Sequence, residues 1–196
     1  MKLRLTAPSK TFLVGEYAIL HGGHALLANT EPRFEVIIST PGEGRCENIH
    51  PNSPAGQWAR THREAFEKID FQFIDPHQGR GGFGASSAQF LLAWAWSLLD
   101  QVPFSRLTEG LDLSQILKDY HSLFEEKSTR PSGGDVVAQS IGGICQVATA
   151  PLTMTEKSWP FKDLDFLIIP TGKKINTHKH LEGLSDAGIE ELKDVS

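Results

Sequence analysis

Residues 79–90 read GRGGFGASSAQF, a glycine-rich run that ends where a strongly apolar segment begins. Four glycines fall within residues 79–84, and glycine loses more conformational freedom on folding than any other residue. A glycine cluster directly before an expected helix therefore needs a geometric reason. Glycines let backbone N–H groups approach an anion closely, and the helix N-terminus adds a partial positive charge. The run predicts an anion-binding turn, and a tight turn with a serine cap is the alternative.

Two phosphate-binding motifs fit this spacing only in part. Residues 79–84 have the form GxGxxG, which requires an acidic residue about 20 positions later at the end of a second strand. Asp100 has that spacing, but it ends the helix expected after the glycines. The same residues fit the GxxxxG of a P-loop, yet Ala85 stands where that motif has lysine. Ser86 and Ser87, in the first turn, can cap the helix or ligate Mg²⁺.

The overall composition is that of an ordinary soluble protein of 196 residues, with 39% hydrophobic and 22% charged residues. A net charge of −5 argues against a nucleic-acid-binding protein, although a local anion site remains compatible with it. The longest apolar stretch, residues 90–99, is too short to cross a membrane. The N-terminus lacks the apolar core of a signal peptide, and the two cysteines form no CxxC pair. We therefore expect a cytoplasmic protein with free thiols and no membrane partner.

The order of strand and helix patterns predicts an α+β fold with an early cluster of strands. Runs rich in β-branched and aromatic residues predict strands, whereas apolar spacing on one side predicts helices. Residues 41–56, with three prolines and three glycines, are expected to be a loop. The expected strands are residues 2–6, 11–14, 24–28, 34–39, 71–75, 142–150 and 164–170. The expected helices are residues 56–69, 86–99, 113–126 and 135–141.

Two further segments resemble specialised sites. Residues 7–28, APSKTFLVGEYAILHGGHALLA, place Lys10 and Glu16 around a strand and a turn. Residues 130–135, RPSGGD, place Asp135 where a glycine-rich turn opens a helix. A single lysine or aspartate is usually a solvated surface charge. The three segments together are more specific than any one of them.

In this order, the three segments resemble the motifs of the GHMP kinases, the superfamily of galactokinase, homoserine kinase, mevalonate kinase and phosphomevalonate kinase. The first family motif, PGK followed by GE(H/Y), is matched by residues 8–10 and 15–17. The second, GLGSSAA, is matched by residues 82–88, and the third, PSGxD followed by GG, by residues 131–135 and 142–143. Tyr17 makes the first motif most similar to that of phosphomevalonate kinase, followed by mevalonate kinase.

This resemblance implies an α+β domain of the ribosomal-protein-S5-domain-2 type, which is the N-terminal ATP-binding domain of the family, at residues 1–165. Residues 166–196 would begin a ferredoxin-like C-terminal domain that is missing or truncated. The implied reaction transfers the γ-phosphoryl group of ATP to mevalonate or phosphomevalonate, in isoprenoid precursor synthesis. Such transfer depends mainly on positioning and charge neutralisation. A chain that stops within a second domain would expose apolar surface, which is a reason to consider a homodimer.

The resemblance also implies roles for individual residues. Lys10 would stabilise the transferring phosphoryl group, and Asp135 would orient or deprotonate the acceptor. ATP would lie along the glycine loop with Mg²⁺ near Ser86. The acceptor would contact Glu16 and Tyr17, and also Ser132 and Gly133. The residues implied for the nucleotide are Gly81, Gly82, Phe83, Gly84, Ala85, Ser86 and Ser87.

Three departures from the family pattern affect the expected activity. Phe124 stands where mevalonate kinase has a Mg²⁺-binding glutamate, so Glu125 would have to replace it from the next position, and two exposed glutamates are the alternative. Ala85 replaces the first serine of the second motif. The C-terminal glycine-rich motif is absent from these residues. A non-catalytic nucleotide-binding or interaction module derived from such a kinase is therefore the second hypothesis.

Overall fold

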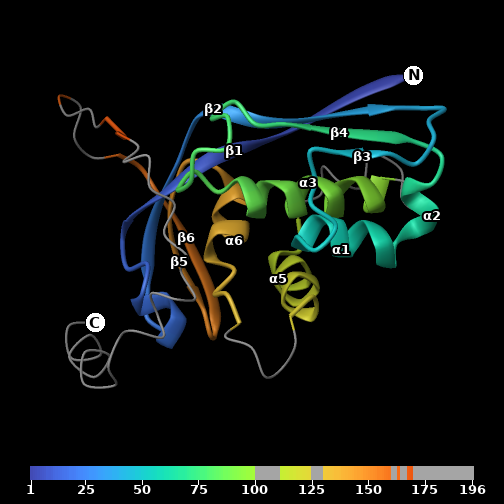
Figure 1. Cartoon of the computed structure of the whole chain (residues 1–196). Helices are drawn as coiled ribbons and strands as arrows, with labels where there is room; N and C mark the ends of the chain where they lie inside the picture. Colours follow the sequence, from blue (N-terminus) through green and yellow to red (C-terminus); the bar gives the residue numbers. More distant parts are fainter. Residues whose placement is uncertain (100–110, 125–129, 160–162, 164–166, 170–196) are drawn as a thin grey trace.

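The computed structural model describes residues 1–99, 111–124, 130–159, 163 and 167–169. A six-stranded sheet carries a layer of helices on one side, as Figure 1 shows for α3 beneath β1 and β4. This mixed architecture confirms the predicted α+β class. Among the described residues, none of the helices has the length and apolar character needed to cross a membrane.

The long strand β2, Ala25–Ser39, holds the sheet together. On one side it pairs antiparallel with β1, Lys2–Val14, along nearly its full length. On the other side its beginning pairs with β5, Ile144–Thr149, and its end pairs with β4, Asp70–Ile74. The short β3, Cys46–Glu47, runs parallel to β4, and β6, Leu152–Lys157, lies antiparallel beside β5.

The helices cover the apolar face of this sheet. The most deeply buried is α3, Ala85–Leu99, which is apolar on nearly all sides and follows the glycine run. The remaining helical elements are η1, Ala18–His21; α1, Pro54–Thr61; α2, Arg63–Phe66; α5, Leu113–Ser122; and α6, Gly134–Ile141. Side chains cap α1 and α5, because Ser53 accepts the Gly56 N–H and Asp112 accepts the Ser114 and Gln115 N–H groups.

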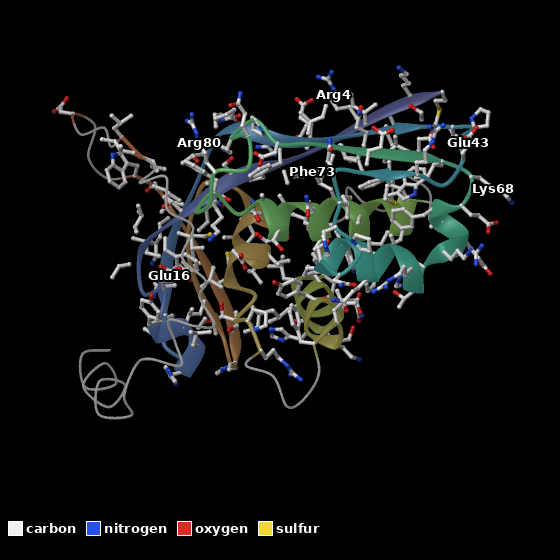
Figure 2. The ribbon with its side chains drawn as sticks, viewed as in Figure 1. Arg4, Glu16, Glu43, Lys68, Phe73 and Arg80 are labelled. Carbon is white, nitrogen blue, oxygen red and sulfur yellow. The ribbon has the colours of Figure 1, made fainter. Side chains whose placement is uncertain are left out.

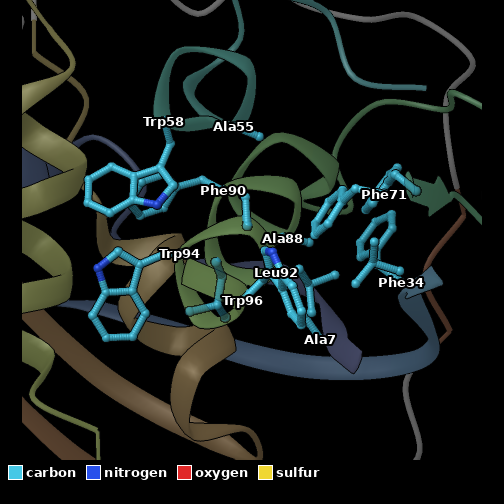
Figure 3. Packing of buried hydrophobic residues seen from close by; sticks show 14 of the residues in the cluster. Ala7, Phe34, Ala55, Trp58, Phe71, Ala88, Phe90, Leu92, Trp94 and Trp96 are labelled. Atoms are coloured by element: carbon cyan, nitrogen blue, oxygen red, sulfur yellow. The ribbon is translucent and has the colours of Figure 1, made fainter. Parts of the chain in front are cut away.

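Two hydrophobic clusters support the two parts of the sheet. The larger cluster packs α3 against β2 and β4, and Figure 3 shows Trp58 beside Phe90 on one side of α3 with Phe34 and Phe71 on the other. Phe90 is fully buried between the ring edges of Trp58 and Tyr120. The smaller cluster lies under α6 and η1 and contains Ile19, Leu27, Val137, Cys145 and Val147. Both cysteines are free thiols, as predicted.

Several predicted boundaries were wrong. Residues 2–6 and 11–14 belong to one strand, and residues 25–28 and 34–39 belong to another, which begins one residue later than expected. The prolines that suggested breaks, Pro8 and Pro32, lie where the β1–β2 register shifts, and a strand accommodates proline at such an irregularity. The expected loop 41–56 contains β3 and the first turn of α1.

The helical predictions also needed correction. The expected helix 56–69 divides at His62 into α1 and α2. The helix expected over 113–126 ends at Ser122. β6 was not predicted, and residues 167–169 of the expected strand 164–170 have no regular structure. The boundary expected at 165/166 lies outside the described residues.

Replacing Phe90 with alanine should lower the free energy of unfolding by about 3–5 kcal/mol, because a fully buried phenylalanine leaves a cavity that the packed helices cannot close. Urea unfolding followed by far-UV circular dichroism would measure the change. Leu167→Ala is the control, since Leu167 is 83% exposed. Equal stability of the two variants would contradict the assigned core.

Candidate active site

A cleft of about 1230 Å³ opens where β1, β4, α3 and α6 come together. Figure 2 shows Glu16 and Arg80 at the end of the molecule where α3 begins, whereas Glu43 and Lys68 lie at the opposite end. The cleft therefore gathers segments that are far apart in the sequence. Its lining includes Lys10, Glu16, Tyr17, Asn48, His50, Asp75, Arg80, Gly81, Gly82, Phe83, Gly84, Ala85, Ser86, Gln89 and Asp135.

The glycine loop is held by residues on both of its sides. Before the loop, the Asp75 carboxylate accepts hydrogen bonds from the His77 and Gly79 N–H groups, both at 2.8 Å. The His77 ring stacks on Phe83 with centroids 3.9 Å apart and 3° between the planes. Its Nε2 lies 2.6 Å from the hydroxyl of Ser9, which is buried in β1. Phe83 thus anchors the loop through its side chain, a role that the sequence motif did not indicate.

The two serines after the loop have different surroundings. Ser87 is buried, and its hydroxyl donates to the Gly84 carbonyl oxygen at 3.0 Å. Ser86 is exposed and lines the cleft. Ser86 therefore has the hydroxyl that a ligand could reach, whereas the Ser87 side chain stabilises the first turn of α3. The first N–H groups of a helix have no partner within the helix, so the first turn of α3 is suited to bind an anion.

Lys10 lies at the centre of the site. Its backbone N–H donates to the Phe83 carbonyl oxygen at 3.0 Å, and its ammonium lies 4.4 Å from the Phe12 ring centroid. The side chain is only 8% exposed, and none of the salt bridges found among the described residues involves it. Lys10 thus lines the cleft with no carboxylate partner among the described salt bridges.

Asp135 enters the cleft from the first turn of α6. Its Oδ1 accepts the Val136 N–H at 3.0 Å. The pKa of the buried Tyr120 hydroxyl is raised well above its usual range. Burial is the main cause, and the negative charge of Asp135 is the second. Asp135 and the glycine loop line the same cleft.

The turn before Asp135 serves packing. Gly133 has a φ of +75°, and a Cβ there would lie 2.3 Å from Leu117 Cδ1, so only glycine lets α5 and α6 approach this closely. The Ser132 hydroxyl accepts the Gly134 N–H at 3.3 Å. Neither residue lines the cleft, although both were predicted to bind substrate. Glu125, predicted to bind Mg²⁺, lies outside the described residues.

His121 braces the same turn from α5. Its Nε2 donates to the Pro131 carbonyl oxygen at 3.0 Å. Burial lowers the pKa of His121, and the nearby Arg130 charge acts in the same direction, against the opposing effect of the backbone hydrogen bonds.

Some residues of the cleft were not predicted from the sequence. Asn48 has a φ of +62°, and its side-chain amide donates to the Phe73 carbonyl oxygen at 2.9 Å. The backbone carbonyl oxygen of Asn48 accepts a hydrogen bond from the Gln89 side-chain amide at 3.1 Å. Gln89 follows Ser86 by three residues on α3, and this helical spacing is the one signal that could have identified it. Asn48 and His50 lie in the segment expected to be a loop and carry no comparable signal.

The donor set of the cleft suits Mg²⁺. The exposed Ser86 hydroxyl and the Asp135 carboxylate supply oxygen ligands, which this ion prefers, and Mg²⁺ commonly completes its shell with water and phosphate oxygens. Among the described residues, no group of three or more His, Cys, Asp or Glu side chains could hold a metal alone.

Comparison with solved structures identifies the fold. The chain is similar to a mevalonate kinase, with a TM-score of 0.59 and 16% identity over 98% of this chain and 70% of that one. It is similar to Streptococcus pneumoniae phosphomevalonate kinase, with a TM-score of 0.57 and 16% identity over 74% of this chain and 48% of that one. The same enzyme has been solved with phosphomevalonate and AMPPNP. The fold is that of the GHMP kinases.

A third similar structure is a D-glycero-D-manno-heptose 1-phosphate kinase from Bacteriodes thetaiotaomicron, with a TM-score of 0.56 and 14% identity over 79% of this chain and 59% of that one. The resemblance stated from the motifs is thus confirmed at the level of the fold. The chain spans between about half and 70% of the length of these structures. No protein-family model and no curated protein matches the sequence.

Replacing Gly84 with alanine should destabilise the protein more than replacing Gly82. Both have positive φ, and alanine in such a conformation costs about 1–2 kcal/mol. At Gly84 a Cβ would also lie 2.8 Å from Lys10 Cγ and 3.0 Å from Gln139 Nε2, whereas at Gly82 it would meet nothing within 4 Å. Urea unfolding of both variants measures the difference, and equal losses would contradict this packing.

His121 should make stability depend on pH. The pKa of His121 is lower in the folded chain than in the unfolded chain, so the unfolded chain takes up a proton on this imidazole at a higher pH. The contribution of His121 to the free energy of unfolding therefore falls as the pH drops below the ordinary pKa of about 6.5. His121→Gln keeps a donor without the titration. Between about pH 7.5 and pH 5.5 the wild type should lose more unfolding free energy than this variant. Equal losses in urea titrations would refute the assignment.

Proposed function

We propose that the chain is an ATP-dependent small-molecule kinase that transfers the γ-phosphoryl group to mevalonate or phosphomevalonate, with Mg²⁺ as cofactor. The observation that supports this most strongly is the meeting of three separate segments in one cleft. β1 contributes Lys10, the glycine loop contributes Ser86, and α6 contributes Asp135. A cation, a helix N-terminus and a carboxylate around one space suit phosphoryl transfer, which depends on charge neutralisation and alignment.

In this proposal the triphosphate lies against the loop 81–84 and the first turn of α3. Lys10 neutralises charge on the transferring group, because its side chain passes beside Gly84 and its ammonium has no carboxylate partner among the described salt bridges. Ser86 and the phosphates hold Mg²⁺, which supplies further neutralisation when bound. Ser87, Ser132 and Gly133 act by holding the first turns of α3 and α6.

The acceptor is proposed to lie between Glu16, Tyr17 and Asp135. Asp135 orients the accepting oxygen and takes its proton where the acceptor is a hydroxyl. A phosphate acceptor is already anionic at neutral pH, so the carboxylate then serves orientation. Mevalonate and phosphomevalonate are proposed because Tyr17 and the residues around it match those kinases best, although the similar structures include a kinase that acts on a heptose phosphate.

A second function is supported by the length of the match. The match covers 48% of the phosphomevalonate kinase structure, so the similarity to that enzyme is shown for only part of its length. A nucleotide-binding or interaction module without turnover would use the same glycine loop. We also propose that residues 1–165 form one domain and that residues 166–196 begin a second one. ADP release distinguishes the two functions.

Lys10→Met and Asp135→Asn should each lower ADP release by about a hundredfold or more, as expected for loss of a group that acts on the transferring charge. Both replacements preserve side-chain size. ADP release with Mg·ATP would be measured with mevalonate, phosphomevalonate, homoserine and D-glycero-D-manno-heptose 1-phosphate.

The control is Lys118→Ala, since Lys118 lies exposed on α5 and outside the cleft. Turnover that survives in both site variants would contradict the roles of Lys10 and Asp135. Nucleotide binding by the wild type without ADP release on any acceptor would support the non-catalytic module instead.

A further inference from the structure

Gln139 is a buried polar residue that the motif resemblance does not include. It lies one turn after Asp135 on α6 and is 3% exposed. Its Nε2 donates to the Pro8 carbonyl oxygen at 2.6 Å and also lies 3.3 Å from the Gly84 carbonyl oxygen. One side chain on the helix of Asp135 therefore contacts both the strand of Lys10 and the glycine loop.

The strand has a particular need for this contact. Pro8 lies at the register shift between Ala7 and Ser9, and such irregularities redirect a strand next to a functional site. A carbonyl group at an irregularity of this kind needs a hydrogen-bond donor from elsewhere. Gln139 supplies the donor, two residues before Lys10 turns toward the cleft.

The loop is connected at the same place. Lys10 N–H donates to the Phe83 carbonyl oxygen, and Gln139 reaches the carbonyl of the next residue, Gly84. A Cβ at Gly84 would touch both the Lys10 side chain and Gln139 Nε2, so the three residues meet around one point. β1, the glycine loop and α6 are thus in contact with one another beside the Lys10 side chain.

The side-chain oxygen of Gln139 argues against a role in stability alone. Its Oε1 is buried and has no hydrogen-bond partner among the described residues. A buried oxygen without a partner destabilises the fold and calls for an explanation. The two carbonyl contacts of the amide nitrogen, on the two segments that carry the site, supply that explanation.

We infer that Gln139 is a positioning residue of the cleft. By joining α6 to β1 and to the glycine loop, it fixes Asp135 relative to Lys10 and the loop amides. The inference rests on the proposed kinase function for its consequence, but the positioning itself can be measured without any nucleotide.

The first measurement is amide hydrogen exchange by NMR on the full chain. Gln139→Met preserves length and removes both contacts, and it should speed exchange of the Lys10 amide about tenfold, the loss expected for one hydrogen bond. Exchange around Val36, at the far end of the β1–β2 pair, should not change. A structural loss of general stability would speed both regions alike, and that result, or no change at Lys10, would overturn the inference.

Two further variants keep the test decisive. Gln139→Asn is polar but too short to reach both carbonyls, so it should reproduce the local effect if Gln139→Met fails to fold. Ser140→Ala is the matched control on the same helix, because it removes only the 2.8 Å hydrogen bond to the Val136 carbonyl oxygen. Faster Lys10 exchange in the control as well would contradict a specific role for Gln139.

The second measurement links positioning to function. Titration with Mg²⁺ and a fluorescent N-methylanthraniloyl ATP should give a dissociation constant about tenfold higher for Gln139→Met than for Ser140→Ala or the wild type. Equal affinities with altered Lys10 exchange would overturn the proposed effect on the site. Failure of the wild type to bind the probe would refute the proposed function instead, while the exchange data would still decide the positioning.

Discussion

The hydrogen bond from the Lys10 N–H to the Phe83 carbonyl oxygen joins the strand that carries the lysine to the loop that carries the glycines. Around this bond, the His77 ring holds Phe83 from one side and the first turn of α3 continues the loop on the other. The glycine loop is therefore tied to β1 by a backbone hydrogen bond, and it lines the cleft.

The cleft shows how an acidic chain can present a site for an anion. The net charge of −5 is distributed over the whole surface, whereas the cleft concentrates a buried lysine, an exposed arginine and a helix N-terminus. Local fields of this kind act over a Debye length of about 10 Å, so the distant carboxylates have little influence on them. The carboxylates of Glu16, Asp75 and Asp135 line the same cleft, so groups of both charges surround one space.

Lys10, the glycine loop and Asp135 were predicted from three short motifs, and the structure brings them to one cleft, while their roles there stay predictions. The extent of the strands was predicted less well. Residues 2–14 and 25–39 were each divided in two because prolines look like strand ends, and only the partner strand shows that the pairing resumes beyond them. β6 has mostly exposed residues and so lacks the alternation that marks a half-buried strand.

Other features depend on contacts that no local pattern contains. Gln139 meets Pro8 across 131 residues, and Asn48 meets Gln89 across 41. The motif resemblance placed Ser132 and Gly133 at the substrate, but a motif does not show that Leu117 occupies the space beside Gly133. Predictions from motifs therefore located the segments of the site and left the direction of individual side chains undetermined.

The split pairing of β2 has a consequence for how the molecule folds and fluctuates. Because its first residues pair with β5 and its last with β4, the two hydrophobic clusters share one strand as a common wall. Local opening of a protein follows contiguous cooperative units, and core strands are among its most stable parts. The glycine loop beyond β4 and the helix that leads into β5 are therefore both attached, through their neighbouring strands, to this one strand.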